Sequence, residues 1–227
     1  AAVEHDGSGS VVLLSDGERS VVRFEADFTT ENGPDLYAVA GALLKDWGAP
    51  AVVSEVEIDA KGRKVLTSNN TVLSGLSGSG GLTWTETDKA LPMPVDMNDA
   101  PTALAVKSSD FRETLNRQSL KITGLSSGYY ALRIDGQQVS VFTADQLAAG
   151  LDLTALPTPM LKQAQEVHVL TLKRSGIHNT RWRTLEVPLA NDGLAKNAAA
   201  MEALDALDAE LEAKQRAAAK PLARQYE

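Results

Sequence analysis

The chain has 227 residues, of which 43% are hydrophobic, enough for one sizeable core or two small ones. Its 22 basic and 30 acidic residues give a net charge of −8 and a pI near 5.0, which argues against a surface for nucleic acid or anionic membranes. The absence of cysteine excludes disulfides, thiolate catalysis, cysteine-ligated zinc and c-type haem attachment. Small molecules, glycans and proteins remain as partners.

No apolar run approaches the roughly 18 residues of a membrane span, so we expect no transmembrane helix. The first residues, Ala1 to Glu4, lack the basic and apolar stretches of a signal peptide. The small residues Ala1 and Ala2 are weakly consistent with a signal that has been removed.

Residues 1–50 predict a β-hairpin and a connecting helix. Two apolar runs, 11–14 and 21–24, flank Ser15-Asp16-Gly17, a sequence favoured in hairpin turns. Apolar residues then fall at helical spacing from Leu36 to Trp47, although part of this segment is also compatible with a strand. Gly48 supplies a C-cap for that helix.

Residues 51–150 carry short alternating runs separated by turns, the pattern of a β-sandwich-like module. From Leu82 to Thr87 the alternation is strict, with Trp84 and Glu86 on one face of the expected strand. Segments 120–123, 129–134 and 139–142 predict a meander, whose last two strands are joined by Asp135-Gly136 as a two-residue hairpin turn.

Tyr130 follows a loop that resembles the tyrosine corner of sandwich domains, in which a tyrosine hydroxyl bonds back to the preceding loop. Packing in the core is the favoured interpretation of this residue. A second capping pattern begins at Thr143 and predicts a short helix ending before Gly150.

Residues 151–227 predict a helical tail that packs on the module or on a partner. Thr158-Pro159 provides an N-cap and a proline at the first helical position, and we expect this helix to end at Ser175-Gly176. From Leu194 to Leu211 an apolar stripe follows the helical period, and an isolated helix of this kind is marginal without a partner surface. The stripe therefore predicts docking on the same chain or formation of an oligomer.

No catalytic, cofactor or metal residues are predicted. The three histidines, His5, His168 and His178, are too far apart in sequence for a metal motif, and no Gly-x-Ser-x-Gly nucleophile turn is present. Asp96 and Asp99 lie in a segment that imitates a calcium loop, but the glycine and distal glutamate of that motif are missing.

Five residues form a candidate ligand or packing surface. Aromatic rings can stack on sugars, and arginines beside a tryptophan can form cation–π contacts, although core packing explains the aromatic residues more economically. The five are Trp84, Tyr130, His178, Arg181 and Trp182.

Residues 42–227 resemble the C-terminal region of bacterial SGNH (GDSL-type) hydrolases, secreted esterases or acylhydrolases that often act on glycans. Six segments carry the resemblance: 42–53, 85–94, 105–111, 142–144, 177–183 and the closing alanine-rich helix. In that family the Gly-Asp-Ser nucleophile and Gly-x-Asn-Asp oxyanion segments lie upstream of this region, and neither is found here. Where the family has its Asp-x-x-His base, this chain has Asp27 to Thr30, with Thr30 in place of histidine.

Residues 1–40 resemble the first half of a DM-thirteen domain, an extracellular β-module, through segments 5–11 and 28–37. The second half of that module, with its cysteine, is missing. The join near residue 40 is compatible with a natural fusion, a processed fragment or an erroneous sequence.

We therefore expect an α+β fold, an antiparallel β-sandwich-like module with a helical C-terminal region. The expected function is that of a non-catalytic accessory module, extracellular or periplasmic, that binds a glycan or a protein. Two alternatives remain: a portion of an SGNH ester hydrolase whose catalytic half lies on another segment, and a self-assembling structural protein.

Overall fold

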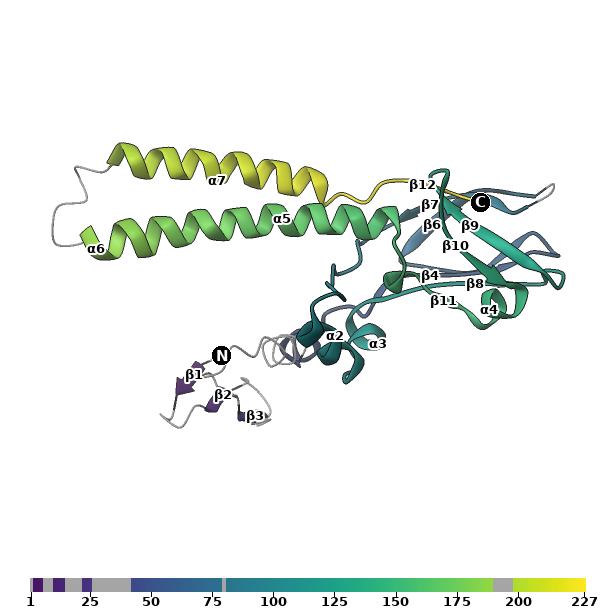
Figure 1. Ribbon diagram of the computed structural model, residues 1–227, viewed down its shortest axis with the longest axis horizontal. Helices are drawn as coiled ribbons and strands as arrows, with labels where there is room; N and C mark the ends of the chain where they lie inside the picture. The colour runs from purple at the N-terminus through teal and green to yellow at the C-terminus, as the bar shows by residue number, and fades with distance from the viewer. Residues whose placement is uncertain (1, 6–9, 15–21, 26–41, 79–80, 190–197) are drawn as a thin grey trace. The chain divides into compact units, whose positions relative to one another are not determined.

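The computed structural model describes residues 2–5, 10–14, 22–25, 42–78, 81–189 and 198–227 (Figure 1). The chain forms two compact units, Ala1–Ala51 with Val95–Leu115, and Val52–Pro94 with Asn116–Glu227. The first stretch of the second unit begins at Val52. The second unit differs from the expected division, because it holds both the sandwich and the helical tail, and residues 95–115 join the first unit.

The first unit contains a small antiparallel sheet in the order β1-β2-β3, formed by Ala2–His5, Ser10–Leu14 and Val22–Glu25. The pairing of β2 with β3 confirms the predicted hairpin, and β1 is an additional strand. The connecting turn and most of the predicted 36–47 helix lie outside the described residues, but residues 42–46 are helical.

Two helices, α2 (Ala100–Lys107) and α3 (Phe111–Leu115), complete the first unit. Gly48 has a φ of 70°, the left-handed conformation expected of a C-cap residue. An ion pair between Lys45 and Asp110 links the 42–46 helix to the 95–115 segment. This contact joins sequence-distant parts of the first unit.

The second unit is built on two packed sheets, which confirms the α+β class. One sheet has the strand order β10-β9-β12-β7-β6 and the other the order β11-β8-β4-β5. Most pairs are antiparallel, but β4 and β8 are parallel, so the sandwich is not purely antiparallel. The strands are β4 (Val52–Asp59), β5 (Lys64–Asn69), β6 (Thr71–Ser77), β7 (Thr83–Asp88), β8 (Arg117–Thr123), β9 (Tyr129–Ile134), β10 (Gln137–Thr143), β11 (Leu151–Asp152) and β12 (Arg224–Tyr226).

The predicted meander is only half correct. The β9–β10 hairpin forms as expected, with both Asp135 (φ 53°) and Gly136 (φ 74°) in the left-handed region that a tight hairpin turn requires. The 120–123 segment belongs to β8, which lies in the opposite sheet. Gly124, with a φ of 75°, begins the loop that carries the chain from one sheet to the other.

Apolar side chains from both sheets meet in one core. Its fully buried members come from alternate positions of the strands, as a two-layer packing requires. They include Val56, Ile58, Trp84, Leu120, Ile122, Leu132, Ile134 and Tyr226.

Strand β12 was not predicted from the sequence. Its three residues lie between β7 and β9 in the middle of the five-stranded sheet, where Tyr226 pairs with both Trp84 and Ile134. Asp135 holds the strand in place, because its carboxylate accepts hydrogen bonds from the backbone N–H of Gln225 (2.9 Å) and from Arg224 (2.8 Å). The end of the tail therefore returns to the sandwich.

Two helix starts form as predicted. Thr143 caps α4 (Ala144–Ala149) in a reciprocal capping box with Gln146. Thr158 caps α5 (Pro159–Asn179), with the proline at the start of the helix.

The predicted end of this helix at Ser175-Gly176 is wrong. The chain continues without a break through α5 into a π-helical segment, η2 (Thr180–Glu186), and then α6 (Val187–Leu189). A glycine inside a helix costs only about 1 kcal/mol relative to alanine, and packing against another helix offsets that cost.

The packing partner is α7 (Ala198–Ala218), which lies beside α5 and forms a helical hairpin with it (Figure 1). Docking of the tail helix on its own chain was one of the two expected outcomes. Leu194 lies outside the described residues. Within α7, Met201 and Leu204 are half-buried, whereas Leu207 is 45% exposed.

Candidate functional site

A pocket of the second unit lies at one end of the sandwich and has a volume of about 840 Å³. Its walls come from strands β7 and β9 and from the loops beside them, and core residues of the opposite sheet reach its floor. The residues that define it include Arg63, Leu82, Thr83, Trp84, Ile122, Leu125, Tyr129, Tyr130, Ala131, Leu132, Arg133, Leu147 and Glu227.

Two adjacent tyrosines in this pocket have different roles. The hydroxyl of Tyr130 donates a hydrogen bond to the backbone carbonyl of Ser126 at 2.8 Å, which confirms the predicted tyrosine corner. Tyr129 is 82% exposed. The corner fixes the loop, and Tyr129 supplies an accessible aromatic ring.

Trp84 belongs to the core rather than to an accessible surface. Its side chain is 2% exposed and stacks on Tyr226, with ring centroids 4.9 Å apart and planes inclined by 16°. The indole N–H donates to the Glu86 carboxylate at 3.0 Å. The core-packing interpretation of Trp84 is therefore confirmed. The buried indole also forms part of the pocket lining.

Glu86 and Asp88 are carboxylates buried on the inner face of β7 beside this stacked pair. Burial, and next the charge of Asp88, raise the pKa of Glu86 to about 8. Gln118 from the opposite sheet donates to Asp88 at 2.9 Å, and both residues are buried. Sequence alternation correctly placed Glu86 on the Trp84 face but did not signal a buried acid.

The pocket rim carries charged residues of both signs. Arg133 lies 3.9 Å from the Glu227 carboxylate, and both side chains are about half exposed. Arg63, an exposed residue with a φ of 49°, adds a further cation at the rim. A bound molecule would therefore meet an aromatic ring, an apolar floor and polar edges.

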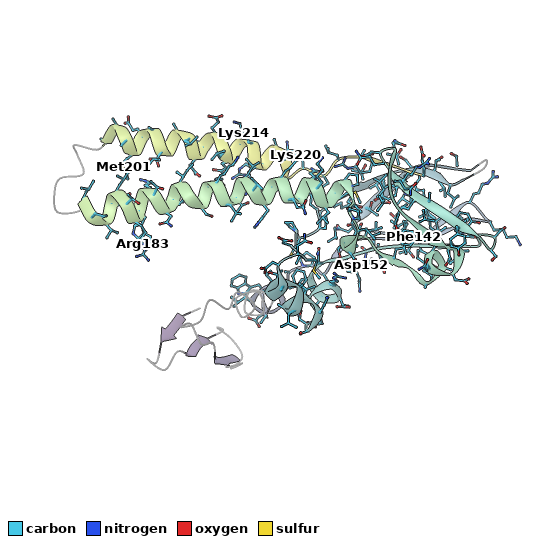
Figure 2. The ribbon with its side chains drawn as sticks, viewed as in Figure 1. Phe142, Asp152, Arg183, Met201, Lys214 and Lys220 are labelled. Atoms are coloured by element: carbon cyan, nitrogen blue, oxygen red, sulfur yellow. The ribbon has the colours of Figure 1, made fainter. Side chains whose placement is uncertain are left out.

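His178, Arg181 and Trp182 do not belong to this pocket. They line a separate surface hollow of about 560 Å³ near the end of the helical hairpin, where Arg183 and Met201 are labelled in Figure 2. Trp182 is 54% exposed, and the Arg183 guanidinium lies 4.6 Å from its ring centre. The five predicted surface residues are thus divided between two places.

Ion pairs join the two helices near that hollow. Arg181 lies 3.2 Å from Asp205 on α7 and 3.4 Å from Glu186. His178 contacts Asp208 on α7 at 3.1 Å. These side chains therefore take part in packing the hairpin.

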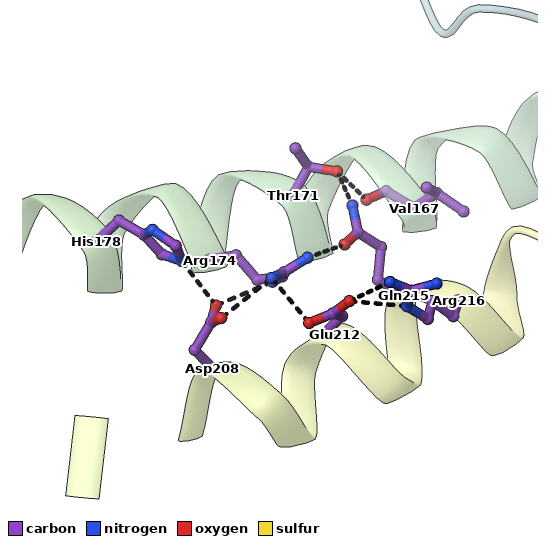
Figure 3. A network of polar contacts seen from close by, with 8 residues as sticks. All are labelled: Val167, Thr171, Arg174, His178, Asp208, Glu212, Gln215 and Arg216. Atoms are coloured by element: carbon purple, nitrogen blue, oxygen red, sulfur yellow. Dashed lines mark hydrogen bonds and ion pairs between the residues drawn. The ribbon is translucent and has the colours of Figure 1, made fainter. Parts of the chain in front are cut away.

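Arg174 is the centre of the hairpin network shown in Figure 3. Its guanidinium donates two bonds to the Asp208 carboxylate (2.9 and 3.0 Å), one to Glu212 (3.3 Å) and one to Gln215 (2.8 Å). Hydrogen bonding to Arg174 is the main cause that lowers the pKa of Asp208 to about 2. Asp208, Glu212 and Gln215 are polar residues that are half-buried on α7, and Arg174 provides their hydrogen-bond partner.

The residues that imitate a calcium loop have structural roles. Asp99 caps α2 by accepting bonds from the backbone N–H and hydroxyl of Thr102. Asp96 accepts a bond from the Asn98 backbone in the preceding turn. Among the described residues, no group of three or more potential ligands could hold a metal ion. Thr30 lies outside that part of the chain.

Comparison with known proteins shows a likeness in fold alone. No family model and no curated protein matches the chain. A solved structure described as a gut microbial diltiazem-metabolizing enzyme matches with a TM-score of 0.70 at 21% identity, covering 86% of this chain. The match covers 54% of that enzyme's chain, so this chain spans about half its length. No helix in the described ranges is long and apolar enough to cross a membrane.

Proposed function

We propose that the chain is an exported, non-catalytic accessory module that uses the pocket at the end of the sandwich to bind a glycan or a protein. The observation that carries this proposal is the pocket itself. It is about 840 Å³ in volume, within the usual range for binding sites, and it is held by a tyrosine corner and a stacked aromatic pair.

The polar chemistry of the described residues supports binding rather than catalysis. His178 has an aspartate partner, but within the described ranges no serine hydroxyl is hydrogen-bonded to a histidine, as an activated nucleophile would be. The buried Glu86 and Asp88 are enclosed by the core and bond to core residues. Tyr129, in contrast, is accessible and adjoins an apolar floor.

The test is a binding measurement on the intact chain with a glycan array and a peptide library, followed by titration calorimetry. Tyr129→Ala should weaken binding of any ligand found, while Trp182→Ala, which removes an exposed ring on the hairpin, should leave it unchanged. Turnover of an acetyl ester or of diltiazem by the purified chain, abolished by a single serine substitution, would contradict the proposal.

A second candidate is a portion of an SGNH-type ester hydrolase whose catalytic half lies on another segment. The sequence resemblance of residues 42–227 favours it, and this chain spans only about half the length of the structure that it matches in fold. Intact mass measurement of the native protein tests this candidate. A mass equal to that of these 227 residues would count strongly against it.

A further inference from the structure

A cluster of polar side chains is buried between the two sheets of the second unit. Glu86 and Asp88 belong to β7 and Thr71 to β6, whereas Gln118 comes from β8 in the opposite sheet. All four residues are less than a tenth exposed. The bond of 2.9 Å from the Gln118 amide to the Asp88 carboxylate therefore joins the two sheets through their interior.

The hydrogen bonds of this cluster are incomplete. The Glu86 carboxylate accepts bonds from the Trp84 indole at 3.0 Å and from the Thr71 hydroxyl at 3.5 Å. In the described part of the chain, Oδ1 of Asp88 and Oε1 of Gln118 have no hydrogen-bond partner. Buried acceptors without a donor are destabilising, so this place favours an added proton or a water molecule.

The charges around the two acids do not neutralise them. Within the described ranges no lysine, arginine or histidine forms an ion pair with Glu86 or Asp88. On β12, Arg224 projects to the same side as Tyr226, but its guanidinium is bound to Asp135 at 2.8 Å. Burial, and next the charge of Glu86, raise the pKa of Tyr226 well above its usual value, so the phenol stays neutral.

One proton shared by the two acids removes most of this conflict. A protonated Glu86 donates to Asp88 and still accepts the bond from Trp84. Burial is the largest cause that raises the pKa of Glu86 to about 8, followed by the charge of Asp88, and hydrogen bonding with Asp88 raises it further. The pair therefore carries one negative charge below that pH and two above it.

The cluster lies close in sequence to the points where the chain leaves the second unit and returns to it. Strand β7 ends at Asp88, shortly before the exit at Pro94, and β8 begins directly after the return at Asn116. The Asn116 side chain bonds to both backbone groups of Met93, at 2.8 and 3.2 Å. These bonds and the one from Gln118 to Asp88 link the end of β7 to the start of β8.

We propose that Glu86 and Asp88 form a proton-operated switch that controls the link between β7 and β8. With one shared proton the two strands stay linked. Loss of that proton to solvent leaves two like charges side by side, which repel each other and draw water into the core, so the link opens while the rest of the sandwich stays folded. The opened link adjoins both ends of segment 95–115, the part of the first unit that interrupts the second in sequence. This inference is independent of the proposed binding function.

The first test follows the carboxyl carbons by NMR in the intact ¹³C-labelled chain between pH 4 and 10. The Glu86 carbon should titrate with a midpoint near 8, and the signal of the neighbouring Asp88 should move with it. Glu86→Gln identifies the signal. This measurement needs no variant to remain folded, because the titration itself is made on the wild type.

The second test asks whether the link opens. Trp47→Phe and Trp182→Phe together remove the two exposed tryptophans and leave the buried Trp84, which donates to Glu86, as the fluorescent reporter. Quenching of its fluorescence by acrylamide should increase several-fold between pH 7 and 9.5. The far-UV circular dichroism should stay the same over this range, because the strands remain folded.

Glu86→Gln, made in the same background, should lock the switch. Its amide donates to Asp88 and accepts from Trp84, as the protonated acid does, so quenching should stay low at both pH values. Glu57→Gln is the matched control, because Glu57 is a partly exposed acid that pairs with Lys121 at 2.9 Å. It should leave the pH dependence of quenching unchanged.

Four outcomes would overturn the switch. They are titration of Glu86 near the ordinary value of 4.5, quenching that does not change with pH, a change that persists in Glu86→Gln, and loss of circular dichroism together with the quenching. The last would mean that the whole sandwich unfolds instead of opening locally. None of these measurements involves a ligand, so their failure leaves the proposed function standing.

Discussion

The sandwich and the helical hairpin of the second unit are stabilised by different interactions. The sandwich buries large apolar and aromatic side chains such as Trp84, Ile58 and Tyr226 in one continuous core. The hairpin brings α5 and α7 together through Arg174 and the carboxylates of Asp208 and Glu212. Burial of apolar side chains is the main interaction within the sandwich. Hydrogen bonds between charged side chains are the main polar interaction between the two helices of the hairpin.

This difference shows why an apolar stripe was an incomplete description of α7. The inward positions include Leu204 and Leu211, but Asp208 lies between them and Gln215 follows. These positions are separated by three or four residues, so they share one helix face. Leu207, a member of the predicted stripe, lies off that face and is exposed.

The largest expected effect concerns the stacked pair in the sandwich. Tyr226→Ala should lower the free energy of unfolding by about 3–5 kcal/mol, because it leaves a cavity beside Trp84 and weakens the short strand β12. Tyr226→Phe is the matched control and should cost less than about 1 kcal/mol, since the hydroxyl contacts only the Met160 sulfur at 4.0 Å. Urea denaturation measures both. Equal losses would show that the stacking is not the source of stability.

The second prediction concerns the buried Glu86. A folded-state pKa near 8 against 4.5 means that the folded protein retains a proton that the unfolded chain loses. The contribution to stability is full below pH 4.5 and disappears as the pH rises through 8. Glu86→Gln should remove this dependence and stabilise the protein at pH 9 by on the order of 3 kcal/mol.

Urea unfolding at pH 5, 7 and 9 measures the effect of this substitution. Glu57→Gln is the control, because Glu57 is a partly exposed residue that pairs with Lys121 on the surface. It should leave the pH profile of the wild type unchanged. Parallel profiles for the wild type and Glu86→Gln would contradict the raised pKa.

The third prediction tests the charged clamp of the hairpin. Arg174→Met should increase hydrogen exchange along α7 while changing the melting temperature of the sandwich less than Tyr226→Ala does. Arg216→Met is a matched control, because Arg216 also bonds to Glu212 but is 78% exposed. Exchange in α7 that responds equally to both variants would show that Arg174 has no special role.

The smallest effect is expected on the exposed side of α7. Leu207→Glu should change stability by no more than about 0.5 kcal/mol, because Leu207 is exposed and lies off the packed face of α7. Analytical ultracentrifugation of this variant tests the self-assembly hypothesis, because Leu207 is accessible to a second chain whereas Leu204 is half-buried in the hairpin. An oligomer in the wild type that Leu207→Glu dissociates would support self-assembly.

Local signals in the sequence predicted local structures. Asp135-Gly136, Thr143 and Thr158 each act through residues within a few positions of themselves, and the structure confirms all three. Tyr130 belongs to the same class, because its partner Ser126 is four residues away. The α+β class followed from the sum of such signals.

Features that depend on distant residues could not be predicted in this way. Nothing within β12 distinguishes Arg224 to Tyr226 from an irregular tail, since its partners lie near residues 85 and 134. Glu86 occupies an inward position that alternation identifies, but its burial depends on how the two sheets pack, and its partner Thr71 lies on another strand. The pocket is likewise a product of strand order, which no single segment contains.

The central position of β12 also constrains the order of folding during synthesis. Gln225 bonds to Thr85 across 140 residues, so the five-stranded sheet cannot close until residues 224–226 have left the ribosome. Until then β7 and β9 each present an unpaired edge, the kind of surface that promotes association between nascent chains. Such long-range closure predicts that the sandwich is completed slowly, only after its other strands have been synthesised.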